Sequence, residues 1–314
     1  MTVAYKIHTA KETLKEPPPI KWIIEDVIGE QTFALFYGEA GSKKTYSLFD
    51  MCVCMAAGEN WLGHKTKSVK VLIIDQESGE LRMWRRMHLI LNGHKIKKDI
   101  PLDYVSMAGF NLMKATDTEH LKILIRKTNA QVVLIDALVD VMPGADESSA
   151  KDTSVAFGNL KDLVHCTGIT LIIIHHTNRK GMYRGSSNIK AQVDMMLEIE
   201  SAQKSSRVQF KADKLRDSDE LEFVATAHFD KKYFYLSLGD PTCKSTTCVQ
   251  YILDSIDRES CSLQTLQTNA PKKLSASAIK TALYKLIDEK KIARANPGAQ
   301  GVEALYERRN GHTN

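Results

Sequence analysis

A glycine-rich stretch near residue 40 constrains the fold of this chain more than any other part of its sequence. It reads GEAGSKKT over residues 38–45, follows an apolar run at residues 32–37 and precedes a helical pattern that begins at Tyr46. A strand, a tight turn and a helix in this order direct backbone N–H groups and the positive end of the helix dipole to one place, where they can bind phosphate. The stretch therefore predicts a phosphate-binding loop rather than an ordinary turn.

This loop departs at one position from the usual pattern G-x-x-x-x-G-K-S/T. Lys43 stands where the second motif glycine is expected, so a backbone conformation that only glycine tolerates would make nucleotide turnover slow. Lys44 is expected to reach the β- and γ-phosphates of ATP, and Thr45 to hold Mg²⁺. The residues of this stretch expected to bind the nucleotide are Gly38, Gly41, Ser42, Lys43, Lys44, Thr45 and Tyr46.

Short apolar runs and helical patterns alternate downstream of the loop. The runs that read as buried parallel strands occupy residues 69–75, 131–136 and 170–176. Helical patterns lie at residues 46–57, 81–91, 117–128 and 153–166, with a short one from residue 189. Four later runs look like strands joined by hairpin turns, at residues 195–200, 206–212, 220–227 and 233–238. These patterns predict an α/β domain with a mainly parallel central sheet, helices on both faces and an antiparallel extension.

The 314 residues exceed one typical domain, and breaker residues divide them. Residues 1–19 read as an N-terminal arm that ends in three prolines, and residues 20–240 as the α/β domain. A polar linker at residues 241–247 then leads to a small domain at residues 248–314. The small domain contains three helical patterns followed by a hairpin, which predicts a winged helix.

Charge and cysteine content limit the partners. A net charge of +5, from 43 basic and 38 acidic residues, permits a nucleic-acid partner without requiring one. No apolar run approaches the roughly 20 residues of a membrane helix, and the N-terminus is polar, so a cytoplasmic protein with no membrane partner is expected. Cys243 and Cys248 lack a second pair of ligands, so no metal site is expected beyond Mg²⁺ bound with ATP.

Acidic residues follow two of the predicted strands. Asp136 closes the run at residues 131–136, where its carboxylate can accept from Mg²⁺-bound water near Thr45; the alternative is a helix cap. Glu77 follows the run at residues 69–75 and can polarise the water that attacks the γ-phosphate. Asp75 is a rival for that role, and Glu77 could instead cap the next helix.

A histidine pair and a cationic loop come next. His175 and His176 end a predicted strand and could report the γ-phosphate to the loop at residues 177–187, although core histidines are an equal alternative. The loop suits contact with a nucleic-acid backbone, the alternative being a solvated turn. Its cations are Arg179, Lys180 and Arg184.

Two further cations, Lys214 and Arg216, follow a later strand. They lie far from the phosphate loop in sequence, so they are expected to act on the neighbouring subunit's γ-phosphate as an arginine finger in a ring. The alternative is a charged hairpin.

In the order of these parts the chain resembles the RecA-fold ATPases of the plasmid RepA type, hexameric replicative helicases related to the DnaB group. The segments that carry the resemblance lie within residues 20–238 and read GEAGSKKT, VLIIDQES, VVLIDALVDVMPGADESSAKDT, IIIHHTNRKG and RGSSNIKAQVD. The resemblance implies a RecA-like P-loop core that binds ATP and Mg²⁺. At the nucleotide it implies triphosphate and Mg²⁺ binding for Lys44, Thr45 and Asp136, and the catalytic base for Glu77. It implies a γ-phosphate sensor for His176 and contact with the nucleotide base for Arg86. Beyond the nucleotide it implies DNA contact for Arg184 and action across the subunit interface for Lys214 and Arg216.

The C-terminal part resembles winged-helix domains in general. Its second recognition-type helix, residues 275–289, presents Lys280 and Lys285, and residues 244–314 carry 11 basic and 7 acidic residues, a surplus of +4. Such a helix can enter the major groove of DNA, although winged helices also bind proteins.

These expectations combine into a hexameric, DNA-acting motor, a replicative helicase-like ATPase of a plasmid, phage or other mobile element. Single-stranded DNA would pass through the ring channel, and the tail would recruit duplex DNA, a replication initiator or a primase. Two alternatives without unwinding are an ATP-switched DNA-binding regulator and a recombination mediator that coats single strands.

Overall fold

A computed structural model describes residues 9–146, 149–177, 187–202, 205–217, 220–239, 248–256, 260–270, 274–288, 291–295 and 304–308. The chain divides into two compact units, Met1–Leu238 and Gly239–Asn314. Within the described ranges, no helix combines the length and the apolar character that crossing a membrane requires.

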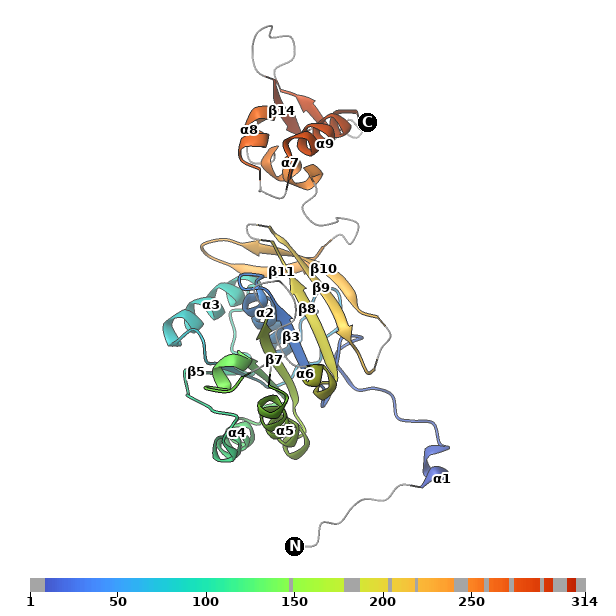
Figure 1. The fold of residues 1–314 in the computed structure, drawn as a ribbon, viewed down its shortest axis with the longest axis vertical. Helices are drawn as coiled ribbons and strands as arrows, with labels where there is room; N and C mark the ends of the chain where they lie inside the picture. Colours follow the sequence, from blue (N-terminus) through green and yellow to red (C-terminus); the bar gives the residue numbers. More distant parts are fainter. Residues whose placement is uncertain are drawn as a thin grey trace. The chain divides into compact units, whose positions relative to one another are not determined.

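One nine-stranded sheet forms the centre of the first unit, in the order β11-β10-β9-β8-β3-β7-β6-β4-β5 (Figure 1). The parallel strands are β3 (Phe33–Gly38), β4 (Val71–Asp75), β5 (Leu102–Ser106), β6 (Val132–Asp136), β7 (Thr170–His176) and β8 (Met195–Glu200). The antiparallel strands are β9 (Arg207–Lys214), β10 (Glu222–Phe229) and β11 (Phe234–Leu238). The prediction of a mainly parallel sheet with an antiparallel extension is confirmed.

Helices cover both faces of this sheet. On one face lie α2 (Lys44–Ala57) and α3 (Glu80–Gly93), and on the other α4 (Ala115–Thr128), α5 (Ala150–Thr167) and α6 (Ser187–Gln192). Successive side chains of β3 alternate between two hydrophobic cores, so that Phe36 packs with the α2 side and Leu35 with the α5 side. Every residue of β3, β4 and β6 is buried, which explains why these strands read as continuous apolar runs.

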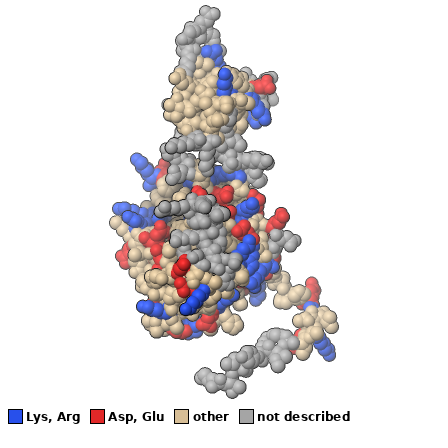
Figure 2. Space-filling model, viewed as in Figure 1, with Lys and Arg blue, Asp and Glu red and all other residues tan. Residues whose placement is uncertain are grey.

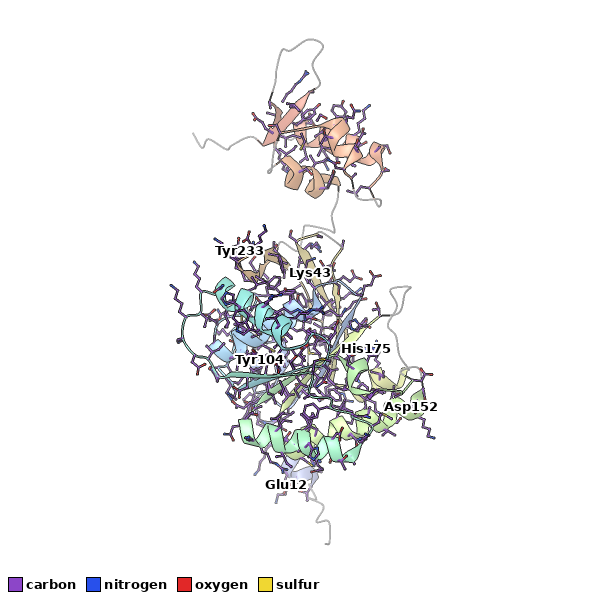
Figure 3. All side chains as sticks on the ribbon, turned by 90° about the vertical axis from the view of Figure 1, so that its left-hand side faces the viewer. Glu12, Lys43, Tyr104, Asp152, His175 and Tyr233 are labelled. Carbon is purple, nitrogen blue, oxygen red and sulfur yellow. The ribbon has the colours of Figure 1, made fainter. Side chains whose placement is uncertain are left out.

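The sequence did not indicate β5. This strand forms the edge of the sheet, none of its residues is fully buried, and Tyr104 is 39% exposed (Figure 3). An edge strand covered on one side carries no continuous apolar run, so it lacks the signal that identified its neighbours. Trp22 lies in a small hairpin of β1 (Trp22–Ile24) and β2 (Ile28–Gly29), and the arm contains the short helix α1 (Ala10–Thr13).

The second unit has its own apolar core, which includes Ile252, Ile279 and Leu283. Its helices are α7 (Cys248–Ile256), α8 (Leu263–Thr268) and α9 (Ala276–Asp288). A sheet in the order β12-β14-β13 accompanies them, formed by β12 (Cys261–Ser262), β13 (Ile292–Arg294) and β14 (Leu305–Arg308). The winged-helix assignment stays a prediction.

Candidate functional site

Two glycines shape the loop between β3 and α2. A Cβ atom on Gly38 would lie 2.2 Å from the carbonyl oxygen of Ile199, because the end of β8 passes directly beside this position. Gly41 has a φ of +82°, in the region that favours glycine. Close backbone approach therefore requires glycine at the first motif position, 38, and the backbone conformation favours glycine at position 41, which the motif leaves open.

Lys43 occupies a left-handed conformation, with φ 65° and ψ 18°, at the N-cap of α2 (Figure 3). A non-glycine residue in this region costs roughly 1 to 2 kcal/mol. Its ammonium donates to Oγ of Ser201, 2.7 Å away, which holds the side chain against the segment after β8. The structure thus gives Lys43 the conformation for which the usual motif supplies glycine.

Replacing Lys43 with glycine is expected to raise the free energy of unfolding by about 1 kcal/mol relative to Lys43→Ala, because glycine adopts the left-handed conformation without the strain that a Cβ atom adds. The measurement is denaturant unfolding of the nucleotide-free chain. Lys43→Ala is the matched control, because alanine removes the ammonium and keeps the backbone strain. Equal stability of the two variants would show that the backbone at this position is not strained.

The amino end of α2 is open to an anion. The first N–H groups of a helix point out of its end, and no side chain among the described residues caps them here. Lys44 is 4% exposed and donates to the carbonyl oxygens of Gly38, at 2.8 Å, and Glu39, at 2.7 Å. Burial lowers the pKa of Lys44 to about 8, while Asp136 and Glu77 oppose that shift. The lysine therefore lies folded over the loop, near two carboxylates.

Asp136 lies at the same edge of the sheet, opposite Asp75 in the register of β6 and β4. It is fully buried, and neither carboxylate oxygen has a hydrogen-bond partner among the described residues. Burial raises the pKa of Asp136 to about 7, and the nearby Thr45 hydroxyl opposes the shift, although its geometry falls short of a hydrogen bond. A buried carboxylate left without partners, beside a hydroxyl, fits the ligand set of a divalent cation. Thr45 and Asp136 are therefore the residues that would hold Mg²⁺.

The two acids at the carboxyl end of β4, Asp75 and Glu77, differ in their hydrogen bonds. Asp75 is buried and accepts hydrogen bonds from the Ser78 N–H, at 3.0 Å, and from the Ser106 hydroxyl, at 2.8 Å. Glu77 is exposed, yet its charge reaches both neighbouring groups. It adds to the upward shift in the pKa of Asp136 and opposes the downward shift that burial causes in the pKa of Lys44. Asp75 is thus occupied in fixing the turn, which favours Glu77 as the acid that is free to act on a water.

His176 ends β7 directly beside Gly38, its partner in the register of β3 and β7. Burial and the nearby Lys44 lower the pKa of His176, so its imidazole is neutral at pH 7. His175 is 1% exposed, which suits a core histidine. Asp140, in the 3-10 helix η1 (Leu138–Val141), also lies near these residues. Its pKa is raised mainly by burial and in addition by the negative charge of Glu77. Sequence reasoning missed Asp140, which no motif distinguishes.

Arg86 and Tyr46 pack against each other on α3 and α2. The guanidinium lies 5.7 Å from the centre of the Tyr46 ring and also donates to the hydroxyl of Ser78. Tyr46 in turn packs on Phe229 and on Phe234, with ring centres 5.2 and 4.8 Å away. Contact of Arg86 and Tyr46 with a nucleotide stays a prediction.

Lys214 and Arg216 lie away from their own phosphate loop. Lys214 donates to the carbonyl oxygens of Lys190 and Val193, both at 2.7 Å, and Arg216 pairs with Asp194 at 3.3 Å. The Asp194 N–H bonds to Phe33 at the amino end of β3, whereas the loop follows its carboxyl end. These cations therefore do not reach the loop of the same chain, and their action on a neighbouring chain stays a prediction.

The predicted nucleic-acid contacts fall into two sets. Arg179, Lys180 and Arg184 lie outside the described residues. Lys280 and Lys285 are exposed on α9, opposite its buried side chains. On the face of the first unit shown in Figure 2, basic and acidic side chains are intermixed, so charge alone does not locate a nucleic-acid surface there.

A family model described as an AAA domain matches residues 4–182. No curated protein sequence matches the chain. A solved DnaB-like replicative helicase, described with its interactions with primase, has a TM-score of 0.52 at 14% identity, over 67% of this chain and 58% of that one. A second solved structure, an ATPase domain, has a TM-score of 0.50 at 13% identity, over 66% of this chain and 85% of that one.

A KaiC-like protein from Pyrococcus horikoshii OT3 has a TM-score of 0.48 at 14% identity, over 68% of this chain and 93% of that one. Of the DnaB-like helicase, this chain spans 58%, which is less than two thirds of that protein's length. At these identities the similarity concerns the fold, which is RecA-like, with a P-loop at the carboxyl edge of a mainly parallel sheet.

Proposed function

Because the chain belongs to the AAA domain family, we propose that it hydrolyses ATP with Mg²⁺ and couples this reaction to work on DNA. The observation that supports this most directly is the group of side chains at the carboxyl edge of the sheet. Lys44, Asp136, Glu77 and His176 come from four separate segments and meet beside an uncapped helix end. This arrangement suits phosphoryl transfer, in which positioning and charge provide most of the catalysis.

Each residue has a distinct task in this proposal. Lys44 and the first N–H groups of α2 bind the β- and γ-phosphates, while Thr45 and Asp136 hold Mg²⁺, which would neutralise phosphate charge when bound. Glu77 accepts a proton from the attacking water. His176, neutral at pH 7, can donate a hydrogen bond to the γ-phosphate and respond to its loss.

The active site is proposed to be completed by a second copy of the chain. Lys214 and Arg216 lie at a distance from their own loop, which suits a head-to-tail ring in which they reach the next subunit. Following the RepA-type resemblance, we propose a hexameric, helicase-like motor of a mobile element, with single-stranded DNA in the channel and an initiator or primase as partner. The tail, with Lys280 and Lys285 exposed, would bind duplex DNA.

Mixing subunits tests the shared active site. In this proposal an Arg216→Ala chain leaves the active site of the adjacent subunit without its arginine. Adding such chains to wild-type chains is therefore expected to lower ATPase activity by more than dilution alone. Lys231→Ala, which removes an exposed lysine between β10 and β11, is the matched control and should leave the activity unchanged. Activity that equals the sum of the separate components would contradict the interface role.

Strand displacement separates the motor from its alternatives. The expected result is ATP-dependent release of a strand from a forked duplex. The left-handed Lys43 favours a second candidate, an ATP-switched DNA-binding regulator with slow turnover. ATP-dependent DNA binding without strand release would support that regulator and contradict the helicase.

A further inference from the structure

Three side chains with metal-binding atoms meet in the core of the first unit, outside the nucleotide site. Asp50 and Cys54 lie one helical turn apart on α2, and His94 follows the end of α3. One ligand atom from each lies within 4.8 Å of the other two. The Nε2 atom of His94 is 2.8 Å from Oδ1 of Asp50 and 3.8 Å from Sγ of Cys54.

Asp50 is fully buried and incompletely paired. Its Oδ1 atom accepts from His94 and from the N–H of Leu236, at 3.1 Å, whereas Oδ2 has no hydrogen-bond partner in the described ranges. The indole of Trp61 lies close by, but its geometry falls short of a hydrogen bond, and its Nε1 is likewise left without a partner. Burying a carboxylate with one oxygen unpaired is costly, and a cation bound to Asp50 would offset that cost.

His94 is also oriented as a metal ligand commonly is. Its second ring nitrogen, Nδ1, lies 3.4 Å from Oε2 of Glu59, just past the end of α2. Histidines that bind metals usually donate the opposite N–H to a carboxylate, which fixes the ring and the tautomer. Glu59 is 47% exposed and the His94 side chain 12%, whereas Asp50 and Cys54 are buried.

We propose that Asp50, Cys54 and His94 bind a zinc ion that is independent of ATP and Mg²⁺. Zinc accepts this mixed set of oxygen, sulfur and nitrogen ligands, and its bond lengths place neighbouring ligand atoms about 3.3 to 3.8 Å apart. The 3.8 Å between Sγ and Nε2 already meets this range, and the 2.8 Å hydrogen bond must open by about 0.5 Å. On binding, the Cys54 thiol releases its proton to solvent as the sulfur–zinc bond forms. A water would supply the fourth ligand.

The same three residue types also form catalytic Cys-His-Asp groups, in which the cysteine is the nucleophile. The surroundings of Cys54 argue against that role. Cys54 is 1% exposed, and burial raises the pKa of its thiol. Sulfur lies 3.8 and 4.0 Å from the two ring nitrogens, inside the buried core of the first unit. A thiol that is buried and kept protonated in this way is a poor nucleophile.

The position of the ion would stabilise the scaffold of the nucleotide site. Asp50 and Cys54 belong to the helix that begins at the phosphate loop, and His94 ends the helix that follows Glu77. Through the Leu236 N–H, Asp50 also holds β11. A zinc ion would therefore fix α2 to α3 and to the edge of the antiparallel extension.

Cobalt substitution tests the proposal on the untagged full chain, after removal of metals with a chelator and without nucleotide. Titration with Co²⁺ is expected to give a thiolate-to-cobalt charge-transfer band that saturates at one ion per chain and disappears when Zn²⁺ is added. Cys54→Ser should abolish the band, and His94→Asn should weaken Co²⁺ binding by at least about 10-fold. Glu59→Gln should weaken it less, because that residue only orients His94.

Cys166→Ser is the matched control, since Cys166 is an exposed thiol that could bind cobalt adventitiously. It should keep the full band. Zn²⁺ should also raise the melting temperature of the stripped wild-type chain and of Cys166→Ser, but not that of Cys54→Ser. Absence of a thiolate band in the wild-type chain, or a band that survives Cys54→Ser, would overturn the proposal, whatever the outcome of the ATPase measurements.

Discussion

Lys44→Ala is expected to lower ATP hydrolysis by at least about 100-fold, the usual loss when a preorganised charge is removed from a reacting group. Lys44 is the buried cation of the loop, and its ammonium now rests on the carbonyl oxygens of Gly38 and Glu39, from which it can move onto phosphate. The measurement is steady-state phosphate release with saturating ATP, Mg²⁺ and single-stranded DNA. Unchanged DNA-stimulated hydrolysis in this variant would remove the basis of the ATPase proposal.

Two further variants make the Lys44 result specific. Lys70→Ala removes a lysine at the other end of the sheet, where its ammonium pairs with Asp103 at 2.7 Å, and should leave hydrolysis unchanged. Glu77→Gln should reduce hydrolysis by about 100-fold while ATP still binds, because the loop and Lys44 remain intact. If Glu77→Gln hydrolyses ATP normally, Glu77 is not the base.

The sequence predicted the parts of the site that lie on continuous apolar strands. Because the carboxyl ends of β3, β4, β6 and β7 meet at one edge, recognising these strands and the glycine-rich loop was enough to bring Lys44, Asp136 and His176 together. The motif also predicted that Lys43 would need a backbone conformation that favours glycine. In the structure Lys43 has a φ of 65°, in the left-handed region.

Features that depend on packing between distant segments could not be predicted from sequence patterns. The strand β5 is half-exposed and lacks an apolar run, and the choice between Asp75 and Glu77 depended on hydrogen bonds from Ser78 and Ser106. The group of Asp50, Cys54 and His94 likewise combines a pair on one helix with a residue 40 positions further along the chain. Its spacing matches no familiar ligand motif, so only the packing of α3 against α2 reveals it.

Asp136→Asn is expected to stabilise the nucleotide-free protein while removing its response to ATP and Mg²⁺. Burial raises the pKa of Asp136 from 3.8 to about 7, so the folded state favours the protonated carboxyl and is penalised when the group ionises. The penalty grows as the pH rises from about 4 to about 7, and about three pKa units correspond to ~4 kcal/mol. Asparagine avoids the charge but buries an amide that also needs partners, so the expected gain at pH 8 is about 1 to 3 kcal/mol.

Denaturant unfolding at pH 8 and pH 5, with and without ATP and Mg²⁺, measures both effects. The gain from Asp136→Asn should shrink at pH 5, where the wild-type carboxyl is already protonated, and ATP with Mg²⁺ should stabilise the wild-type chain but not the variant. Asp75→Asn is the control at the same edge, because its carboxylate accepts two hydrogen bonds and its replacement should destabilise the chain. Equal destabilisation by both variants would mean that Asp136 has partners in the nucleotide-free protein, and its role as a site held ready for a cation would then be lost.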